Sequence, residues 1–306
     1  MADLSEQIVS NLLAEQRKSR RWKNFRFFIW VIILLLIISL IYRSSSETSE
    51  TSGKGGPYGA LVKMNGIVAD GQSFSAENIV PLLTVAFENK SNKVVVLDIN
   101  SPGGSPAQAQ IIYDQIMALK RQYHKPVIAV GQDMMTSAAY LVASAADKIY
   151  VTPETITGSI GVLMQGFGFT HAMEKLGIER RLFTAGKNKV LEDPFSPLKQ
   201  SSVDRIHTIL QTTHQVFIDD VEKGRGKRLK TSDSELFSGS FWLGQKAVAL
   251  GLADGIGNIY SIKPSLGIKN YQYYQPQEPL LKRLVGQTAT AAIEKIRLLA
   301  YDHLQF

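Results

Sequence analysis

The chain has 306 residues, of which 44% are hydrophobic and none is cysteine, with 34 Lys and Arg against 27 Asp and Glu. This length supplies enough apolar material for a large core, and the lack of cysteine excludes a disulfide scaffold, a thiolate nucleophile and cysteine-based zinc sites. The net charge of +7 suggests a nucleic-acid partner at first, but residues 1–43 hold 7 basic and 3 acidic side chains, which is +4 of that excess. The remaining residues are nearly balanced in charge, so we expect no nucleic-acid partner.

A basic leader over residues 1–26 precedes an apolar segment over residues 27–43. Phe27 to Tyr42 form a run of sixteen residues without a charge, which predicts one transmembrane helix. Because the basic side chains gather on the N-terminal side, the positive-inside rule places the N-terminus in the cytoplasm and the rest of the chain across the membrane. A cleaved signal peptide is the alternative, but no clear A-x-A site follows the run.

A linker rich in Ser, Thr and Gly follows over residues 44–57, and then short β-rich runs alternate with helical patterns. The strands are expected at 60–70, 93–100, 126–133, 148–153 and 180–186, and the helices at 75–90, 106–122, 137–146, 171–177 and 200–223. This alternation predicts an α/β fold with a mostly parallel sheet in one domain over residues 58–270. The apolar positions of the C-terminal segment, residues 271–306, indicate core packing or a subunit contact.

The sequence SPGGS at 101–105 lies between a predicted buried strand and a helix. Two glycines there allow a ligand to approach the main chain, and backbone N–H groups at such a turn can bind a phosphate or an oxyanion. Neither G-x-x-x-x-G-K-[ST] nor G-x-G-x-x-G is present, so phosphate binding is the weaker interpretation. A purely structural turn is the alternative.

Ser137 follows a predicted strand and opens a helix of small residues. A serine in this position has its hydroxyl near the positive end of the helix dipole, which favours a nucleophile. The same position suits an N-cap, and a capping role is the alternative to a catalytic one.

The segment GKNK at 186–189 offers a lysine as a general base in place of histidine. Lysine can serve only if its pKa falls well below about 10.4, through burial or nearby positive charge. The five histidines, His124, His171, His207, His214 and His303, form no H-E-x-x-H pattern and no evident acid pair. A Ser/Lys pair is therefore what the residues permit, and no metal or cofactor is expected.

Four segments in this order resemble the signal peptide peptidase A (protease IV) family, in its short single-domain form. They are LDINSPGGS (97–105), SAAYLVASAADKIYVTPETITGSIGVL (137–163), FTAGKNK (183–189) and FWLGQKAVALGLADGIG (241–257). The resemblance implies a crotonase-like and Clp-protease-like fold, a superhelical stack of ββα units, preceded by one transmembrane helix.

The same resemblance implies the roles of individual residues. Ser137 matches the nucleophile, Lys189 the general base and Ser159 a serine that orients the base, and Lys187 competes with Lys189 for the base role. The backbone N–H groups of Gly104 and Ala138 would form the oxyanion hole. Two departures are that Ala138-Ala139 replaces the usual Gly-Gly after the serine, and that Val190 replaces a common acid after the lysine.

The resemblance further implies a membrane-anchored serine endopeptidase that cleaves signal-peptide remnants, in a bacterial inner membrane with its catalytic domain outside the cytoplasm. The family's short forms imply a homo-oligomer, in which one protomer can complete its neighbour's dyad. Because of the departure at Ala138-Ala139, the alternative function is a catalytically silent, membrane-anchored scaffold of the same fold. Acyl-CoA chemistry is a third and weaker reading, since it requires a cytoplasmic pool of substrate.

Overall fold

The computed structural model describes residues 22, 26–33, 35, 57–186, 188–230 and 233–276. The chain divides into two units, Met1–Gly53 and Lys54–Phe306. In the first unit, residues 26–33 and 35 are helical, and no helix among the described residues combines the length and apolar character needed to cross a membrane. Most of the expected anchor over 27–43 and of the linker over 44–57 lies outside the described residues, so both stay predictions.

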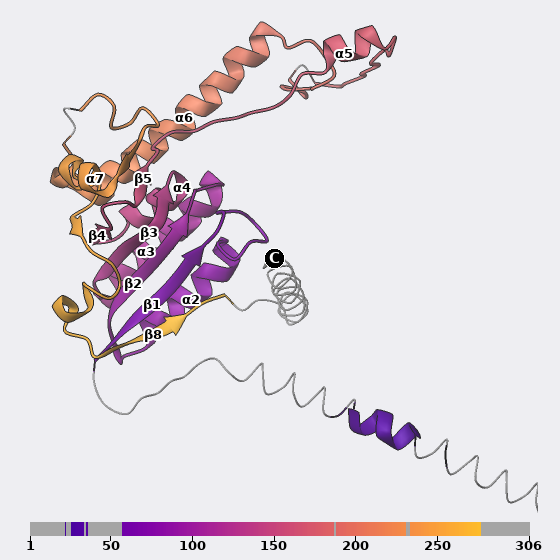
Figure 1. The fold of residues 1–306 in the computed structure, drawn as a ribbon. Coiled ribbons are helices and arrows are strands. Elements are labelled where there is room, and N and C mark those ends of the chain that lie inside the picture. Colours follow the sequence, from indigo (N-terminus) through magenta and orange to yellow (C-terminus); the bar gives the residue numbers. More distant parts are fainter. Residues whose placement is uncertain are drawn as a thin grey trace, which may run out of the picture. The chain divides into compact units, whose positions relative to one another are not determined.

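The second unit is built on a sheet of eight strands (Figure 1). The strands are β1 (Tyr58–Asn65), β2 (Asn92–Ser101), β3 (Val127–Thr136), β4 (Lys148–Val151), β5 (Ile156–Gly158), β6 (Phe241–Leu243), β7 (Gly255–Ile256) and β8 (Asn270–Tyr274). Their order is β6-β5-β3-β2-β1-β8, with β4 between β3 and β7. Every pairing is parallel except that of β5 with β6, so the predicted mostly parallel sheet is confirmed.

The helices follow the strands as the sequence predicts. They are α2 (Ala76–Glu88), α3 (Pro106–Tyr123), α4 (Ala138–Ser144), α5 (Thr170–Lys175), α6 (Gln200–Arg225) and α7 (Gly244–Leu250), with short 3₁₀ turns at Gly226–Arg228 and Lys263–Leu266. The start of α3 shows why these boundaries are readable: Ser105 caps it by accepting a hydrogen bond from the Gln108 N–H, and Pro106 occupies the first turn.

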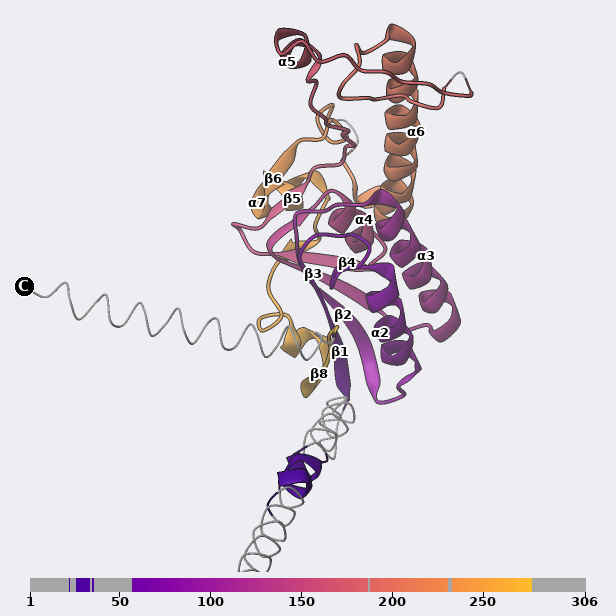
Figure 2. The same cartoon turned by 90° about the vertical axis from the view of Figure 1, so that its right-hand side faces the viewer.

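The main core lies between one face of the sheet and the helices α2, α3 and α4 (Figure 2). All seven residues of α4 are buried, because this helix contacts β3, α3 and α6. A Cβ added to Gly224 of α6 would come within 2.1 Å of the Ser144 carbonyl oxygen, so glycine is what permits α6 to approach the end of α4. The core therefore fixes the helix that follows Ser137.

The opposite face of the sheet has a smaller core, in which Leu61, Val96 and Ile128 pack against Ile262 and Ile268. β8 pairs with β1 through Tyr274, so the sheet extends past residue 270, where the sequence placed the end of the peptidase domain. Residues beyond 276 of the C-terminal segment lie outside the described residues.

The prediction of a strand over residues 180–186 is wrong, because these residues have no regular secondary structure. They belong to a long excursion between β5 and α6 that carries α5, and Figures 1 and 2 show α5 lying toward the far end of α6, away from the sheet. No described strand of the same chain lies beside residues 180–186. Since a strand needs a neighbour for its backbone hydrogen bonds, local β-propensity alone did not produce one.

Candidate active site

Ser137 sits at the sharp turn between β3 and α4, where its backbone adopts φ +52° and ψ −126°. Such a positive φ is uncommon for a residue with a side chain and is found at strained, functional turns. The Ser137 side chain makes no capping hydrogen bond with α4, and it lies on the lining of a pocket. The side chain is therefore available for chemistry, which favours the catalytic interpretation over the capping one.

The glycine turn that ends β2 lies directly against Ser137. A Cβ added to Gly103, at φ +100°, would come within 2.7 Å of the Ser137 Cβ and 3.1 Å of the Ala138 nitrogen. A Cβ on Gly104, at φ +146°, would come within 2.2 Å of the Val68 carbonyl oxygen. Both glycines are thus required for the main chain of this turn to reach the serine. Gly103 was not among the expected site residues, although the double glycine in SPGGS was the signal for it.

Two backbone N–H groups near Ser137 remain available as donors. Val68 bridges the turn by donating to the Gly103 carbonyl at 2.9 Å and accepting from the Ser105 N–H at 2.6 Å, and neither bond uses the Gly104 N–H. Ala138 is the first residue of α4, so its N–H has no acceptor within the helix. Gly104 and Ala138 both line the pocket beside Ser137, as the expected oxyanion hole requires.

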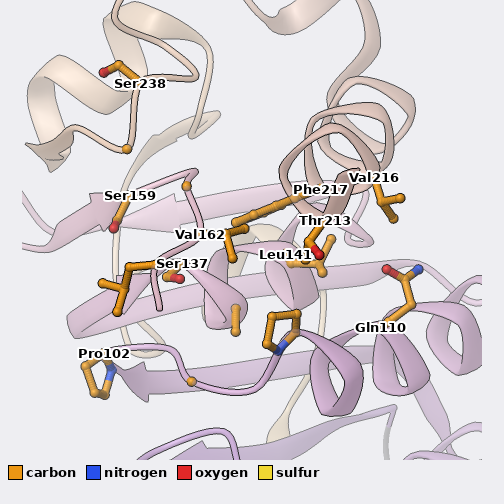
Figure 3. Close-up of a pocket in the computed structure, with 16 residues that line it drawn as sticks. Pro102, Gln110, Ser137, Leu141, Ser159, Val162, Thr213, Val216, Phe217 and Ser238 are labelled. Carbon is orange, nitrogen blue, oxygen red and sulfur yellow. The ribbon is translucent and has the colours of Figure 1, made fainter. Parts of the chain in front are cut away.

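Ser159 follows β5 and also faces the pocket (Figure 3). Its φ is +53°, and its N–H donates to the Ser240 carbonyl at 2.8 Å. The preceding residue accepts a hydrogen bond from Ser137, because the Ser137 N–H donates to the Gly158 carbonyl at 2.8 Å. The two serines predicted to act together are therefore held on neighbouring backbone segments.

The pocket has a volume of about 490 Å³ and draws its walls from five parts of the chain. Figure 3 shows Val162, Leu141, Val216 and Phe217 around the serines, so much of the wall is apolar. The full lining is Pro102, Gly104, Pro106, Gln110, Ser137, Ala138, Leu141, Ser159, Gly161, Val162, Leu163, Thr213, Val216, Phe217, Ser238 and Gly239. None of these described residues carries an acidic or basic side chain, so the described lining offers serine hydroxyls and backbone donors but no side chain that could act as a base.

Lys189, the expected base, is exposed and does not line this pocket. Its N–H donates to the Gly186 carbonyl at 3.2 Å, which places it in a turn of the excursion between β5 and α6. Lys187, the competing candidate, lies outside the described residues. One copy of the chain thus brings together Ser137, Ser159, Gly104 and Ala138, but not Lys189.

The excursion that carries Lys189 exposes many large apolar side chains. Phe169 stacks on Phe195 with 5.7 Å between ring centroids, and both rings remain partly exposed. The exposed members between residues 161 and 199 are Leu163, Met164, Phe167, Phe169, Leu176, Ile178, Leu182, Phe183, Val190, Phe195 and Leu198. Exposed apolar surface of this extent is typical of interaction sites.

Comparison with known proteins supplies independent information about this arrangement. A family model described as peptidase family S49 matches residues 119–267, and a model described as Clp protease matches residues 56–165. A solved structure of a 1510-N membrane-bound stomatin-specific protease aligns over 73% of this chain and 100% of its own, at 13% identity and a TM-score of 0.49.

Several relatives have a higher sequence identity to this chain than that solved structure has. A Brucella melitensis protein named Na(+)/H(+) antiporter NhaA is 38% identical over 230 residues, which cover 73% of this chain and 31% of that protein. Protease 4 of Haemophilus influenzae is 33% identical over 203 residues, covering 65% of this chain and 32% of its own length. A putative signal peptide peptidase SppA of Enterococcus faecium is 31% identical over 207 residues, covering 64% and 59%.

The chain spans less than two thirds of the length of each of these relatives. The two family models overlap and together extend from residue 56 to residue 267, which includes Ser137, Ser159 and the glycine turn. The relatives named as proteases align over about the same share of the chain. Over residues 119–267 the chain thus matches peptidase family S49, and it is related in sequence to proteins named Protease 4 and putative signal peptide peptidase SppA.

Proposed function

We propose that this chain is a serine endopeptidase in which Ser137 is the nucleophile and Lys189 the general base. The observation that carries the proposal is the backbone of Ser137, which is held at φ +52° between the glycine turn and α4. The Ser137 side chain makes no capping hydrogen bond to that helix. A strained serine beside two available N–H donors is the arrangement needed for acyl transfer. The family assignment supports the same chemistry.

The mechanism proceeds through an acyl-enzyme. Neutral Lys189 accepts the proton of the Ser137 hydroxyl while the Ser137 Oγ attacks the substrate carbonyl carbon, and the N–H groups of Gly104 and Ala138 stabilise the resulting oxyanion. Lys189 then donates that proton to the leaving amine, and the peptide C–N bond breaks. A water molecule, deprotonated by Lys189, hydrolyses the ester and releases Ser137. Ser159 positions the lysine by hydrogen bonding.

Lys189 reaches the site from a neighbouring copy in this proposal, so the enzyme acts as a homo-oligomer. Two observations support it. The described lining of the Ser137 pocket lacks a basic side chain, and the excursion that carries Lys189 exposes an apolar surface suited to burial against another protein. The C-terminal segment over 271–306 is a further candidate contact.

The substrates we propose are cleaved signal peptides and other membrane-derived peptides. The apolar wall formed by Leu141, Val162 and Phe217 suits apolar side chains, and a relative is named a putative signal peptide peptidase. The basic leader over 1–26 and the apolar run over 27–43 support a single-pass anchor in a bacterial inner membrane. With the N-terminus cytoplasmic, the peptidase domain lies outside the cytoplasm.

A serine-directed fluorophosphonate probe tests the proposal on the full-length protein. We expect covalent labelling and peptide cleavage in the wild type, and neither in Ser137→Ala. Lys189→Ala should abolish both, while Lys187→Ala should retain them; the reverse result would transfer the base role to Lys187. A folded wild type that takes no label and cleaves no peptide would instead support the catalytically silent scaffold.

Complementation tests whether the dyad forms between copies. Co-expressed Ser137→Ala and Lys189→Ala chains should recover a fraction of wild-type cleavage, because a mixed oligomer contains sites with both residues intact. No recovery in mixed oligomers, together with an active wild type, would place Lys189 and Ser137 in the same copy.

A further inference from the structure

The sheet ends at β6 in an open edge. Among the described strands β6 pairs with β5 alone. The side chains of Phe241 and Leu243, which lie on the same face of β6, are 66% and 56% exposed. Trp242 between them packs against the core. An exposed apolar edge strand is a template for pairing with another chain.

The backbone groups of this edge follow from the register of β6 on β5. Ser240 accepts a hydrogen bond from Ser159, and in an antiparallel pair alternate residues direct their backbone groups to the same neighbour. Ser240 and Trp242 therefore face β5, while the N–H and C=O groups of Phe241 and Leu243 point outward. The edge can accommodate a further strand along these two residues.

Residues 180–186, with the sequence RRLFTAG, are a strand-like segment that lacks a sheet to join among the described residues. They combine β-forming side chains with no strand neighbour in their own chain, and the Phe183 side chain is 91% exposed. One copy thus has an unpaired strand-like segment and an unpaired edge.

We infer that residues 180–186 of one copy pair with β6 of a neighbouring copy as an additional, antiparallel strand. This interaction rests on the proposed function, and it specifies the contact by which the neighbour supplies Lys189. Phe183, opposite Phe241, is then covered on the face that Phe241 and Leu243 share, and Leu182 lies on the other face, opposite Trp242. The outward backbone groups of β6 gain hydrogen-bond partners in the same step.

The direction of the added strand follows from where its end must lie. β5 runs toward the pocket and ends at Gly158, next to Ser159, and Gly158 pairs with Phe241. A strand antiparallel to β6 runs parallel to β5, so its last residue, Gly186, arrives at the same edge as Ser159. Lys189 is three residues further along, within about 10 Å of extended chain. A strand of the opposite direction would carry Lys189 away from Ser137.

Disulfide cross-linking tests the pairing, because the natural chain contains no cysteine. Full-length Phe183→Cys chains are co-expressed with differently tagged Phe241→Cys chains and oxidised. We expect a disulfide-linked dimer that carries both tags, since cross-strand Cβ atoms lie within bonding reach. Leu182→Cys and Thr184→Cys chains cover the two adjacent registers.

The matched control replaces Phe241→Cys by Val85→Cys. Val85 is on α2, packed over β1 and β2 rather than the β6 edge, and it is 53% exposed. Dimers formed equally with Val85→Cys, or no dimer with Phe241→Cys in any of the three registers, would overturn the pairing.

The complementation experiment with Ser137→Ala and Lys189→Ala chains separates a failure of the strand pairing from a failure of the proposed shared dyad. Complementation without the 183–241 cross-link rejects the strand pairing and keeps the dyad between copies. The cross-link without complementation keeps the pairing and rejects the shared dyad.

Discussion

The N–H of Ser137 donates to the carbonyl oxygen of Gly158 at 2.8 Å, and this hydrogen bond joins the two turns on which the candidate site is built. One turn leads from β3 into α4, and the other leads from β5 to Ser159. Both are at the carboxyl ends of parallel strands, the edge of such a sheet where ligands bind. The bond therefore fixes Ser137, the proposed nucleophile, relative to Ser159, which is expected to orient the base.

The positive φ of Ser137 predicts an unusual order of stability between its glycine and alanine variants. Ser137→Gly should be more stable than Ser137→Ala by about 1 kcal/mol, because glycine adopts φ +52° without the penalty that a Cβ incurs. At ordinary positions the alanine variant is the more stable of the two. Urea unfolding of both variants measures the difference, and an alanine variant of equal or greater stability would show that the turn is unstrained.

Gly103 is predicted to be essential for the geometry around Ser137. Gly103→Ala places a Cβ against the Ser137 Cβ and the Thr136 carbonyl oxygen, so the turn must move away from the site. We expect probe labelling of Ser137 to fall by about 100-fold, comparable to the loss of an oxyanion donor. Gly66→Ala is the matched control: its φ is +88°, but no atom lies within 4 Å of the added Cβ, so it should label at nearly the wild-type rate.

We expect that replacing the buried Asp98 by asparagine stabilises the protein by an amount that increases with pH. The Asp98 side chain is buried on β2, its Oδ1 accepts from the Gln132 amide at 2.6 Å, and its Oδ2 has no hydrogen-bond partner among the described residues. Burial raises the pKa of Asp98, and the Gln132 hydrogen bond and the charge of Lys63 offset only part of this rise. A raised pKa contributes stability below the unfolded value of about 3.9 and loses it as the pH rises through the folded value.

Asp98→Asn removes this ionisation and keeps an acceptor for Gln132. The variant should therefore gain stability relative to wild type as the pH rises from 4 to 7, as measured by urea unfolding at both values. The control Asp70→Asn changes an exposed carboxylate and should shift stability little at either pH. A gain for Asp98→Asn that is equal at both pH values would rule out ionisation as its cause.

The sequence predicted those parts of the fold that depend on local patterns. The apolar run of β2 and the helical pattern of α3 are both short-range signals, and their positions were right to within a few residues. The family resemblance implied the roles of Ser159 and Gly104, and these residues lie with Ser137 because all three follow strands that end at the same edge. The role of Gly103 and the positive φ of Ser137 are consequences of the approach of two loops, which no local pattern encodes.

Residues 180–186 show the opposite case. Their β-forming side chains predicted a strand, but strand formation depends on a neighbouring strand, and no described strand of the same chain is adjacent. The position of Lys189 likewise depends on contacts that the sequence around it does not specify. The family resemblance makes Lys189 the expected base, with Lys187 as its competitor, whereas its distance from Ser137 depends on what the excursion between β5 and α6 packs against.

The buried Arg225–Asp254 ion pair predicts acid sensitivity of the end of α6. The Arg225 side chain is fully buried, its Nη1 donates to Asp254 Oδ2 at 2.7 Å, and its Nε and Nη2 donate to the Gly251 carbonyl oxygen. Burial alone would raise the pKa of Asp254, but the hydrogen bond and charge of Arg225, with the Ile149 N–H and the charge of Arg228, lower it overall. Arg225→Met should destabilise the protein by about 1–3 kcal/mol at pH 7, because it removes the hydrogen bonds of Arg225, while the Ile149 N–H and Arg228 still stabilise the Asp254 carboxylate.

The sign of the pH dependence follows from that lowered pKa. A lowered carboxyl pKa contributes stability above the unfolded value of about 3.9 and loses it as the pH falls through the folded value. The stability difference between wild type and Arg225→Met should therefore shrink as the pH is lowered from 7 toward 3. Arg225→Lys, which retains the charge but not the paired bonds to Gly251, should lie between the two. Guanidinium unfolding across this range measures all three proteins, and a difference that stays constant with pH would mean that Arg225 stabilises through packing rather than through Asp254.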